Sequence, residues 1–396
     1  MCKHCTTFNE YELNSRRNFL DNMMSGVAGL SALSLGGLPA MADDGDDRVK
    51  IGYLPITDAT ALLIAHAQGY FKDEGLDAPK PTLIRGWSPL IEGFVAKKFN
   101  LVHFLKPIPI WMRYKSNFPV KVMGWAHTNG SAMVVGRHTN IKDYADLGGK
   151  QVAIPYWYSV HNILLQQALK KSGITPVIQS ASKPLKDNEC NLQILPPPDM
   201  PIALASRKID AYTVAEPFNA LGELKAGARL IRFTGDIWKN HPCCVVSMHE
   251  ADTINKKKWT QSVMNAIVRA QVDITNNPKE AAEIISRDGK GYLPAPKKVV
   301  EKAMVDYSDK NYTDVIKHKD WDINRIDFFG YPYPSATKKI VTDLKSTLVA
   351  GDRSFLDSLD PEFVAKDLVN YDYIKTAINK HVKNAPSFTR KEEFYL

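Results

Sequence analysis

From Arg48 onward, short apolar segments alternate with segments of helical periodicity, and this alternation constrains the fold more than any other feature of the sequence. Residues 49–54 have the pattern of a buried strand, and residues 61–68 have that of an apolar helix. The same alternation continues through predicted strands at 81–85, 101–105 and 120–125 and predicted helices at 88–98 and 107–114. We therefore expect an α/β fold with mixed, mostly parallel sheets that helices cover on both faces.

A second unit of the same kind follows in the sequence. Its predicted elements are strands at 151–155, 193–195 and 209–214 and helices at about 159–171 and 200–207. A further strand at 245–248 precedes a dominantly helical part, with helices predicted at 259–276, 278–287, 296–307 and 335–349. We expect residues 384–396 to form a loose tail. A chain of 396 residues is long enough for two to three domains.

Residues 1–42 have the pattern of a targeting signal rather than of part of the fold. Arg16 and Arg17 precede a short apolar stretch that ends in an Ala-Met-Ala site at Ala42. This resembles a twin-arginine export signal, with Asp21 where that pattern usually has Lys. The alternative, a single anchor helix, needs about 20 strongly apolar residues. We predict cleavage near Ala42 and a location in the periplasm.

Composition and charge narrow the class of partner. Hydrophobic residues make up 44% of the chain and charged residues 24%, which excludes a disordered chain and a multi-span membrane protein. Lys and Arg (51) exceed Asp and Glu (43), so the formal net charge of +8 mildly favours anionic partners. Because the basic residues are interspersed with acidic ones and export removes the partner, we predict no nucleic-acid binding.

Three cysteines remain after the predicted cleavage: Cys190, Cys243 and Cys244. An odd number in an oxidising compartment leaves open a disulfide between Cys190 and one of the other two. A metal site formed by His241, Cys243 and Cys244 is a second possibility, although partly buried free thiols are commoner. We predict no metal site and no cofactor.

Several motifs occur together in an order that resembles one family. The opening motifs are Ile-Gly-Tyr-Leu-Pro at 51–55, Gly-Tyr-Phe at 69–71 and Glu-Gly-Leu at 74–76. They resemble the start of the solute-binding proteins for nitrate, sulfonate and bicarbonate. The later motifs are closer to the nitrate/bicarbonate branch and comprise Pro155, Ser-Val-His-Asn at 159–162, Pro-Pro-Pro at 196–198, Val-Ala-Glu-Pro-Phe-Asn at 214–219 and residues 235–242. The likeness covers about residues 49–290.

The resemblance implies a type II periplasmic-binding-protein fold, with two lobes and a helical C-terminal extension. Because the chain crosses between the lobes twice in such folds, lobe one would comprise 48–136 plus 240–396 and lobe two 137–239. The implied function is that of a periplasmic component of an ABC importer. It would capture a small anion or anionic organic solute by lobe closure and deliver it to the permease and its ATPase. We expect a monomer without enzymatic activity.

The predicted ligand-binding residues are Trp87, Lys106, Asn129, Ser159, His161, Glu216 and Cys244. Trp87 and Lys106 follow predicted strands, at the carboxyl ends where ligands bind in α/β folds. Ser159 precedes a helix whose free N–H groups and dipole attract anions. The resemblance implies ligand contacts for His161 and Asn129.

Each of these residues also has an ordinary structural role as an alternative. Ser159 suits a helix cap, Trp87 and His161 suit the core, Lys106 suits a solvated surface, and Asn129 suits a turn. Glu216 precedes Pro217 at the rim of the pocket or at the hinge. A buried carboxylate there repels an anion unless it is protonated or paired.

The sequence departs from the nitrate-binding pattern at Cys243 and Cys244. Nitrate-binding relatives have a lysine just after the His-Pro pair, where this chain has Cys243. A charge-assisted hydrogen bond contributes about 1.5–3 kcal/mol, so its absence weakens a simple nitrate assignment. Lys106 is the candidate to compensate for the lost charge.

Two further functions stay open. The aromatic run of Tyr156, Trp157 and Tyr158 leaves room for a heteroaromatic metabolite, such as a thiamine-precursor pyrimidine. An enzyme on the same fold is the other alternative. We regard it as the weaker one, because the sequence has no nucleophile-elbow, zinc-protease, phosphate-loop or dinucleotide motif.

Overall fold

The computed structural model describes residues 46–308, 310–318, 321 and 324–396. The segment interpreted as an export signal, residues 1–42 with Cys2 and Cys5, lies outside the described residues, so that interpretation stays a prediction. Residues 47–396 form one unit, and the description below concerns that unit alone. Within it, none of the described helices combines the length and the apolar character that a membrane crossing requires.

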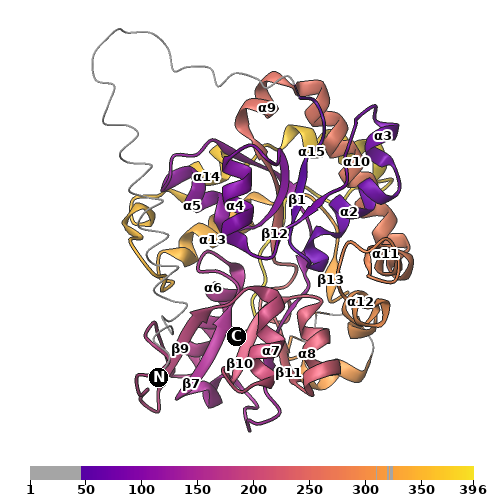
Figure 1. Ribbon diagram of the computed structural model, residues 1–396. Helices are drawn as coiled ribbons and strands as arrows, with labels where there is room; N and C mark the ends of the chain where they lie inside the picture. The colour runs from indigo at the N-terminus through magenta and orange to yellow at the C-terminus, as the bar shows by residue number, and fades with distance from the viewer. Residues whose placement is uncertain (1–45, 309, 319–320, 322–323) are drawn as a thin grey trace, which may run out of the picture. The chain divides into compact units, whose positions relative to one another are not determined.

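The first strand–helix repeats form a five-stranded mixed sheet, drawn in the upper part of Figure 1. Its strands, in spatial order, are β2 (Thr82–Leu83), β1 (Ile51–Tyr53), β3 (Leu101–Leu105), β12 (Cys244–His249) and β4 (Val120–Trp125). Strand β1 is parallel to β2 and β3, whereas β12 is antiparallel to both β3 and β4. The late strand β12 thus enters the middle of a sheet built from residues more than a hundred positions earlier.

The second unit forms a six-stranded mixed sheet, in the lower part of Figure 1. Its strands, in spatial order, are β11 (Arg229–Phe233), β6 (Ser131–Val135), β10 (Ala211–Ala215), β7 (Lys150–Ile154), β9 (Glu189–Ile194) and β8 (Thr175–Val177). The last four are mutually parallel, and β6 is antiparallel to β10 and β11. The two sheets confirm the predicted α/β class and the two-lobe fold.

Strand β6 bears on the predicted division of the chain between the lobes, 48–136 plus 240–396 and 137–239. All of β6 pairs with strands of the six-stranded sheet. We therefore propose that the first crossing lies before Ser131, a few residues earlier than the predicted boundary. We also propose that the return crossing lies between β11 and β12; the predicted boundary at 240 falls in this interval.

Helices cover the sheets, as the alternation predicts. Those of the N-terminal part are α2 (Thr60–Ala67), α3 (Tyr70–Asp73), α4 (Trp87–Val95), α5 (Pro107–Tyr114), α6 (Val160–Lys171), α7 (Met200–Ala205) and α8 (Phe218–Ala226). Those of the C-terminal part are α9 (Glu250–Asn255), α10 (Lys257–Asn276), α11 (Pro278–Ile285), α12 (Lys297–Met304), α13 (Pro334–Leu344), α14 (Pro361–Asp367) and α15 (Asp372–His381). A two-stranded ribbon joins β5 (Thr128–Asn129) to β13 (Ile326–Asp327).

The long helix α10 shows why these segments are helical. Its apolar residues recur every three or four positions, so that Val263, Ile267 and Ile274 lie on one buried face. That face packs against α2 and α15, beside the five-stranded sheet. Helix α5 begins at Pro107, a position where the missing N–H costs nothing.

The C-terminal tail differs from the prediction. Residues 384–396 are not a loose tail, because they pack on the body of the protein. Phe394 stacks on the buried Trp238 with ring centroids 4.9 Å apart, and the indole Nε1 of Trp238 donates to Glu392 at 2.8 Å. The prediction was wrong because polar composition does not reveal which aromatic side chains find a partner in the folded chain.

Candidate ligand-binding site

Sheet topology brings four distant segments to one edge of the five-stranded sheet. The short 3-10 helix η1 (Thr57–Ala59) follows β1, Lys106 follows β3, and His127 comes two residues after β4. Because β12 runs antiparallel to β3 and β4, its first residue, Cys244, lies where those two strands end. The carboxyl ends of three strands and the start of a fourth therefore share one edge, which is where α/β folds bind ligands.

Asp58 and His127 form a buried ion pair at this edge. The Nε2 atom of His127 lies 2.8 Å from Oδ2 of Asp58, and neither side chain is exposed. Burial raises the pKa of Asp58 to about 6, although His127 opposes the shift. Burial alone would lower the pKa of His127, but the charge and hydrogen bond of Asp58 raise it to about 10. Both groups are therefore charged at neutral pH. The attraction between the two charges offsets the free energy that each loses when it is removed from water.

Cys243 lies between this ion pair and the second lobe. Its Sγ lies 3.4 Å from Oδ2 of Asp58 and 3.9 Å from Nε2 of His161. Burial raises the pKa of the Cys243 thiol, but a hydrogen bond from Cys244 and the nearby His161 and His127 outweigh it. The pKa of Cys243 therefore falls well below its usual value. A thiolate of this kind is both a nucleophile and a metal ligand.

Cys244 is fully buried beside Cys243. Burial raises the pKa of its thiol well above the usual value, and the neighbouring Cys243 raises it further. Its place at the start of β12 brings it to the predicted edge. Its role as a ligand-binding residue stays a prediction.

The second lobe contributes His161 and Ser131 to the same place. His161 is the second residue of α6, and its Nε2 lies 2.8 Å from Oγ of Ser131, the first residue of β6. The Ser131 hydroxyl is also 3.7 Å from Sγ of Cys243. Side chains of both sheets thus meet around Cys243.

Ser159 caps helix α6, as one of the two predicted roles requires. Its Oγ accepts the N–H of Asn162 at 3.0 Å and donates to the carbonyl of Tyr156 at 2.7 Å. The cap is confirmed, and a ligand contact by Ser159 stays a prediction.

Lys106 is not a solvated surface lysine. Its side chain is fully buried, and Nζ has no hydrogen-bond partner within the described part of the chain. Burial lowers the pKa of Lys106 to about 7. An ammonium group without a counter-charge is costly in the interior, so an anion that reached Nζ would stabilise its charged form.

Trp87 is the first residue of α4 and is 3% exposed. Its ring meets that of His103 edge to face at 5.6 Å, and its Nε1 has no partner among the residues described. Burial, with help from the charge of His127, lowers the pKa of His103 to about 3, so its ring is neutral. His103 Nε2 accepts the backbone N–H of Leu54 at 3.0 Å. A pocket role for the Trp87 indole N–H stays a prediction.

Glu216 lies at the start of α8, where its carboxylate accepts hydrogen bonds from Nδ2 of Asn219 and the N–H of Ala220. Burial raises the pKa of Glu216 to about 8. Its backbone carbonyl accepts the N–H of Thr57 at 2.8 Å, which connects η1 to the six-stranded sheet. A place of Glu216 at the rim of the pocket or at the hinge stays a prediction, and so does its contact with a ligand.

Asn129 is the last residue of β5, where the chain turns through Gly130 into β6, and it has a left-handed φ of 58°. Its Nδ2 donates to Oδ1 of Asn240 at 3.2 Å. The turn role that the sequence allows is therefore present. Ligand contact by Asn129 also stays a prediction.

The three described cysteines are free thiols. Cys190 lies in β9, in the interior of the six-stranded sheet, and not at the edge that holds Cys243 and Cys244. His241, a member of the metal set considered from the sequence, instead has its Nε2 2.8 Å from Oγ1 of Thr234. Burial lowers its pKa to about 4.

Four side chains of metal-ligating type lie close together in the structure, although the sequence predicts no metal site. We call them the Cys–His–Asp cluster: Asp58, His127, Cys243 and Cys244. Their ligand atoms all lie within 4.8 Å of one another, and all four residues are buried. Asp58, His127, Ser131 and His103 were not among the predicted site residues. Asp58 and His127 each follow a strand of the parallel set, and that position is the signal that sequence reasoning had available.

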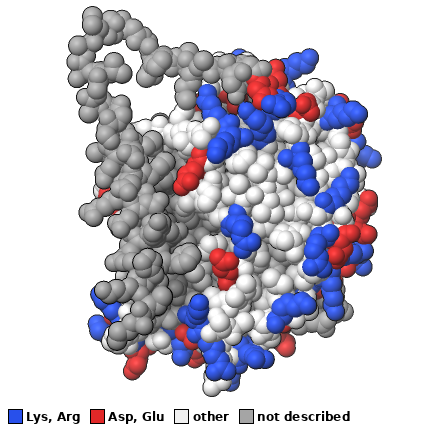
Figure 2. Space-filling model, in the orientation of Figure 1, with Lys and Arg blue, Asp and Glu red and all other residues white. Residues whose placement is uncertain are grey.

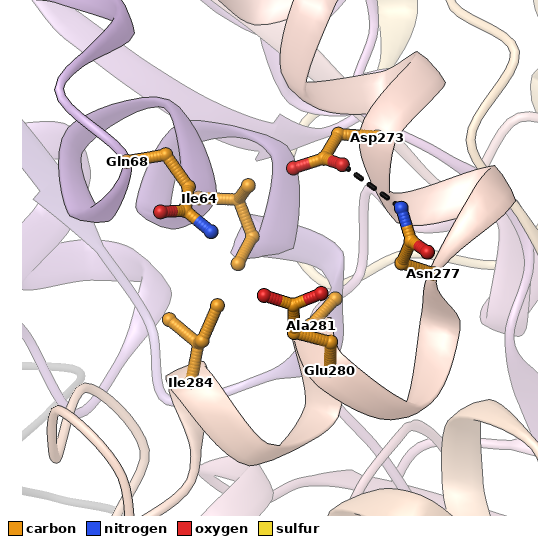
Figure 3. Close-up of a pocket in the computed structure, with 7 residues that line it drawn as sticks. All are labelled: Ile64, Gln68, Asp273, Asn277, Glu280, Ala281 and Ile284. Carbon is orange, nitrogen blue, oxygen red and sulfur yellow. Dashed lines mark hydrogen bonds between the residues drawn. The ribbon is translucent and has the colours of Figure 1, made fainter.

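A separate shallow pocket lies on the outside of the five-stranded lobe, between α2 and the α10–α11 corner (Figure 3). Its lining comprises Ile64, Gln68, Asp273, Asn277, Glu280, Ala281 and Ile284. The only hydrogen bond drawn among these residues joins Asn277 to Asp273, at 3.1 Å. No residue of the Cys–His–Asp cluster lines this pocket, and its exposed carboxylates do not suit an anion.

On the face shown in Figure 2, Lys and Arg are scattered among Asp and Glu rather than collected into one basic patch. Arg269 pairs with Asp73, and Lys297 pairs with Glu283 and Glu301. The positive charge on this face is thus interspersed with negative charge, and the face offers no basic track for a nucleic-acid backbone.

A model of the NMT1-like family matches residues 42–287, more than half of the chain. The chain belongs to the NMT1-like family. The match covers every strand of the two large sheets and all residues of the Cys–His–Asp cluster. It ends at the close of α11, so α12 and the elements after it lie beyond the part of the chain that the family model describes.

Relatives of this NMT1-like protein confirm the resemblance stated from the sequence. The nitrate/nitrite binding protein NrtA of Nostoc sp. is 27% identical over 314 residues, which cover 73% of this chain and 68% of that protein. The nitrate import ATP-binding protein NrtC of Synechocystis sp. is 24% identical over 66% of this chain. The chain spans only 39% of the length of NrtC.

The crystal structure of the periplasmic nitrate-binding protein NrtA from Synechocystis superposes on this NMT1-like chain with a TM-score of 0.72. The alignment covers 88% of this chain and 94% of that one, at 18% sequence identity. At this identity the likeness shows the fold, which is the two-lobe fold of solute-binding proteins. Homology to NrtA supports a substrate-binding component of an ABC importer.

Proposed function

We propose that this protein is exported to the periplasm, where it serves as the solute-binding component of an ABC importer, and that it binds a small anionic solute between its lobes. One observation carries the proposal. His161 and Ser131 of the six-stranded lobe meet Cys243 of the five-stranded lobe inside a fully buried polar site. Polar groups are buried together at a lobe junction where a solute can replace the water that they lose.

Two features favour an anionic solute. Lys106 is buried without a hydrogen-bond partner in the described residues, and a bound anion would supply the missing counter-charge. Helix α6 begins at the same junction, and its first N–H groups and its dipole attract negative charge. Nitrate itself is a weaker candidate than a larger anion, because Cys243 occupies the place of the lysine in nitrate-binding relatives.

The structure gives less support to a heteroaromatic ligand. Trp157 and Tyr158 are less than 10% exposed, and Tyr158 lies against Trp111 and Phe355 with ring centroids about 6 Å apart. Tyr158 therefore packs the six-stranded lobe against α5 and against Phe355 of the C-terminal part. We propose no enzymatic activity, because the matching relatives are binding and ATP-binding proteins of importers.

The mechanism is a shift of population between open and closed lobes. The site residues lie at the junction and are buried, so a solute can enter only when the lobes move apart. A solute that contacts Lys106 from one lobe and the start of α6 from the other stabilises the closed form. The permease and its ATPase would then recognise that form.

A thermal-shift panel tests the ligand class on the full chain. The panel comprises nitrate, nitrite, bicarbonate, taurine, other sulfonates and thiamine-precursor pyrimidines. An anionic ligand should raise the midpoint of the wild type by mass action. It should also raise the midpoint of Lys98→Met, a control variant that lacks an exposed lysine. It should not raise the midpoint of Lys106→Met. If no oxyanion shifts the wild type, the anionic class is wrong.

A further inference from the structure

The Cys–His–Asp cluster has a ligand set that the proposed anion does not need. Its four side chains come from three separate segments: η1, the loop after β4, and the chain entering β12. All four are fully buried at the lobe junction. Two cysteine sulfurs, an imidazole and a carboxylate together suit a thiophilic cation rather than a bare oxyanion.

The spacing of the cluster is close to that of one coordination sphere. Zinc binds sulfur at about 2.3 Å and nitrogen or oxygen at about 2.0–2.2 Å in a tetrahedral arrangement, so two of its ligand atoms are roughly 3.3–3.8 Å apart. The ligand atoms of Asp58, His127, Cys243 and Cys244 all lie within 4.8 Å of one another. Small side-chain rotations would therefore place all four around one ion.

The hydrogen bonding of the cluster is incomplete without an ion. Oδ1 of Asp58 and Nδ1 of His127 are buried, and neither has a hydrogen-bond partner in the described ranges. Buried polar atoms in native proteins are generally paired, so orphaned ligand-type atoms at one point indicate a missing partner.

We propose that the Cys–His–Asp cluster binds one thiophilic divalent metal ion, for which Zn²⁺ is the best match. The proposal deepens the proposed function and rests on it in one respect: the ion would lie between the lobes and would be enclosed when they close. Cys243 also lies 3.7 Å from Ser131 and 3.9 Å from His161 of the other lobe. A metal bound at Cys243 is thereby coupled to the closed arrangement.

Cobalt binding to the reduced full chain tests the proposal. Cys2 and Cys5 are replaced by serine in all proteins compared, so that three of the five cysteines of the full chain remain. The metal-free protein is kept under a phosphine reductant without oxygen, and these three thiols are counted before metal is added. The count excludes a Cys243–Cys244 disulfide as the cause of a negative result. We expect Co²⁺ to produce a thiolate-to-metal charge-transfer band and tetrahedral visible bands. Both should saturate at one equivalent and be displaced by one equivalent of Zn²⁺.

Cysteine variants provide the matched comparison. Cys243→Ser and Cys244→Ser should lose the charge-transfer intensity of one sulfur each and bind Co²⁺ at least about 100-fold more weakly. Cys190→Ser removes a buried thiol outside the cluster and should bind like the wild type. If a serine variant does not fold, Asp58→Asn and His127→Gln test the same site without changing the thiols.

Each outcome decides the proposal. Absence of the charge-transfer band in the reduced wild type, or its equal loss in Cys190→Ser, overturns the metal site. If Zn²⁺ does not bind but an oxyanion raises the midpoint, the metal site is wrong and the proposed function stands. If Zn²⁺ binds with the expected variant pattern and no oxyanion acts, the metal site stands and the anionic class is wrong. Binding of neither contradicts both.

Discussion

The part of the chain that the NMT1-like family model covers and the part beyond it differ in what they contribute to stability. Residues 47–287 supply both large sheets and all the buried ionisable groups of the site. Residues 288–396 supply helices and loops that contact elements of both sheets. The first part thus contains the buried ionisable groups of the site, whose loss of hydration lowers stability. The second part contributes contacts that connect the two lobes.

Contacts of the C-terminal part with the six-stranded lobe are specific. The backbone of Leu348 exchanges hydrogen bonds with Gln166 of α6, at 2.7 and 2.8 Å. The hydroxyl of Tyr307 donates to Glu223 of α8 at 2.7 Å. Both helices belong to the six-stranded lobe, which would move in the proposed opening of the site.

The tail contacts the other lobe as well. The guanidinium of Arg390 lies 4.8 Å from the ring of Trp125 in β4, while its neighbour Glu392 accepts from Trp238 after β11. Opening the lobes would stretch such contacts. The candidate site is thus built in the family-matched part, and under the proposed mechanism its opening would depend on contacts made by the part that the family model leaves out.

The largest expected effect is the loss of Trp238. Trp238→Ala removes a fully buried indole from between the six-stranded lobe and the tail. We expect the free energy of unfolding, measured by chemical denaturation, to fall by about 3–5 kcal/mol. Phe394→Ala removes only the stacked partner and should cost about 1 kcal/mol.

Phe363→Ala is the control for Trp238, because Phe363 is a half-exposed aromatic residue of the C-terminal part. Its loss should change the free energy of unfolding by no more than about 0.5 kcal/mol. Equal stabilities for wild type, Trp238→Ala and Phe394→Ala would show that the tail does not stabilise the protein, and the comparison would fail.

The next effect has the opposite sign and concerns Lys106. Because burial lowers its pKa from 10.5 to about 7, the unfolded chain binds more protons between these values, and wild-type stability rises with pH across that window. Lys106→Met should therefore stabilise the protein by about 2–4 kcal/mol at pH 7 or below. The gain should shrink towards zero above about pH 10.5.

Thermal unfolding at several pH values measures the Lys106 effect, with Lys98→Met as the exposed control. A destabilised Lys106→Met variant would mean that Lys106 contributes to folding rather than to the site. In that case the contrast between a costly site and a stabilising C-terminal part would disappear.

A smaller effect is expected at the contact between α6 and Leu348. Gln166→Ala leaves the N–H and the carbonyl of Leu348 without their side-chain partner, which should cost about 1–3 kcal/mol. Because the contact joins the two lobes, small-angle scattering should also show a larger radius of gyration. Gln261→Ala removes a hydrogen bond to Tyr373 on the five-stranded side and should leave the radius unchanged.

The smallest effect is expected at the helix cap. Ser159→Ala removes the hydroxyl that accepts the N–H of Asn162, and we expect a loss of about 1 kcal/mol in the free energy of unfolding. Ser159→Thr should restore most of it. A loss in Ser159→Ala that thermal unfolding cannot detect would indicate that water or another group satisfies this helix end.

Local patterns alone determined most of the helices and strands. Strand 101–105, helix 107–114 and strand 120–125 agree with β3, α5 and β4 at both ends, since apolar periodicity and Pro107 act over a few residues. The cap at Ser159 and the position of Lys106 after a strand were accessible in the same way. So was the fold class, because strand–helix alternation has few solutions.

Only the tertiary structure decided which side chains meet. The sequence predicts the strand at 245–248, but only the sheet order places it between β3 and β4 and brings Cys243 to Asp58, 185 positions away in the chain. Burial of Lys106 and packing of Phe394 on Trp238 depend on distant partners in the same way. Periodicity in the sequence reflects the environment of a residue over one or two turns of a helix. Contacts between residues far apart in the sequence depend on the tertiary packing of the whole chain.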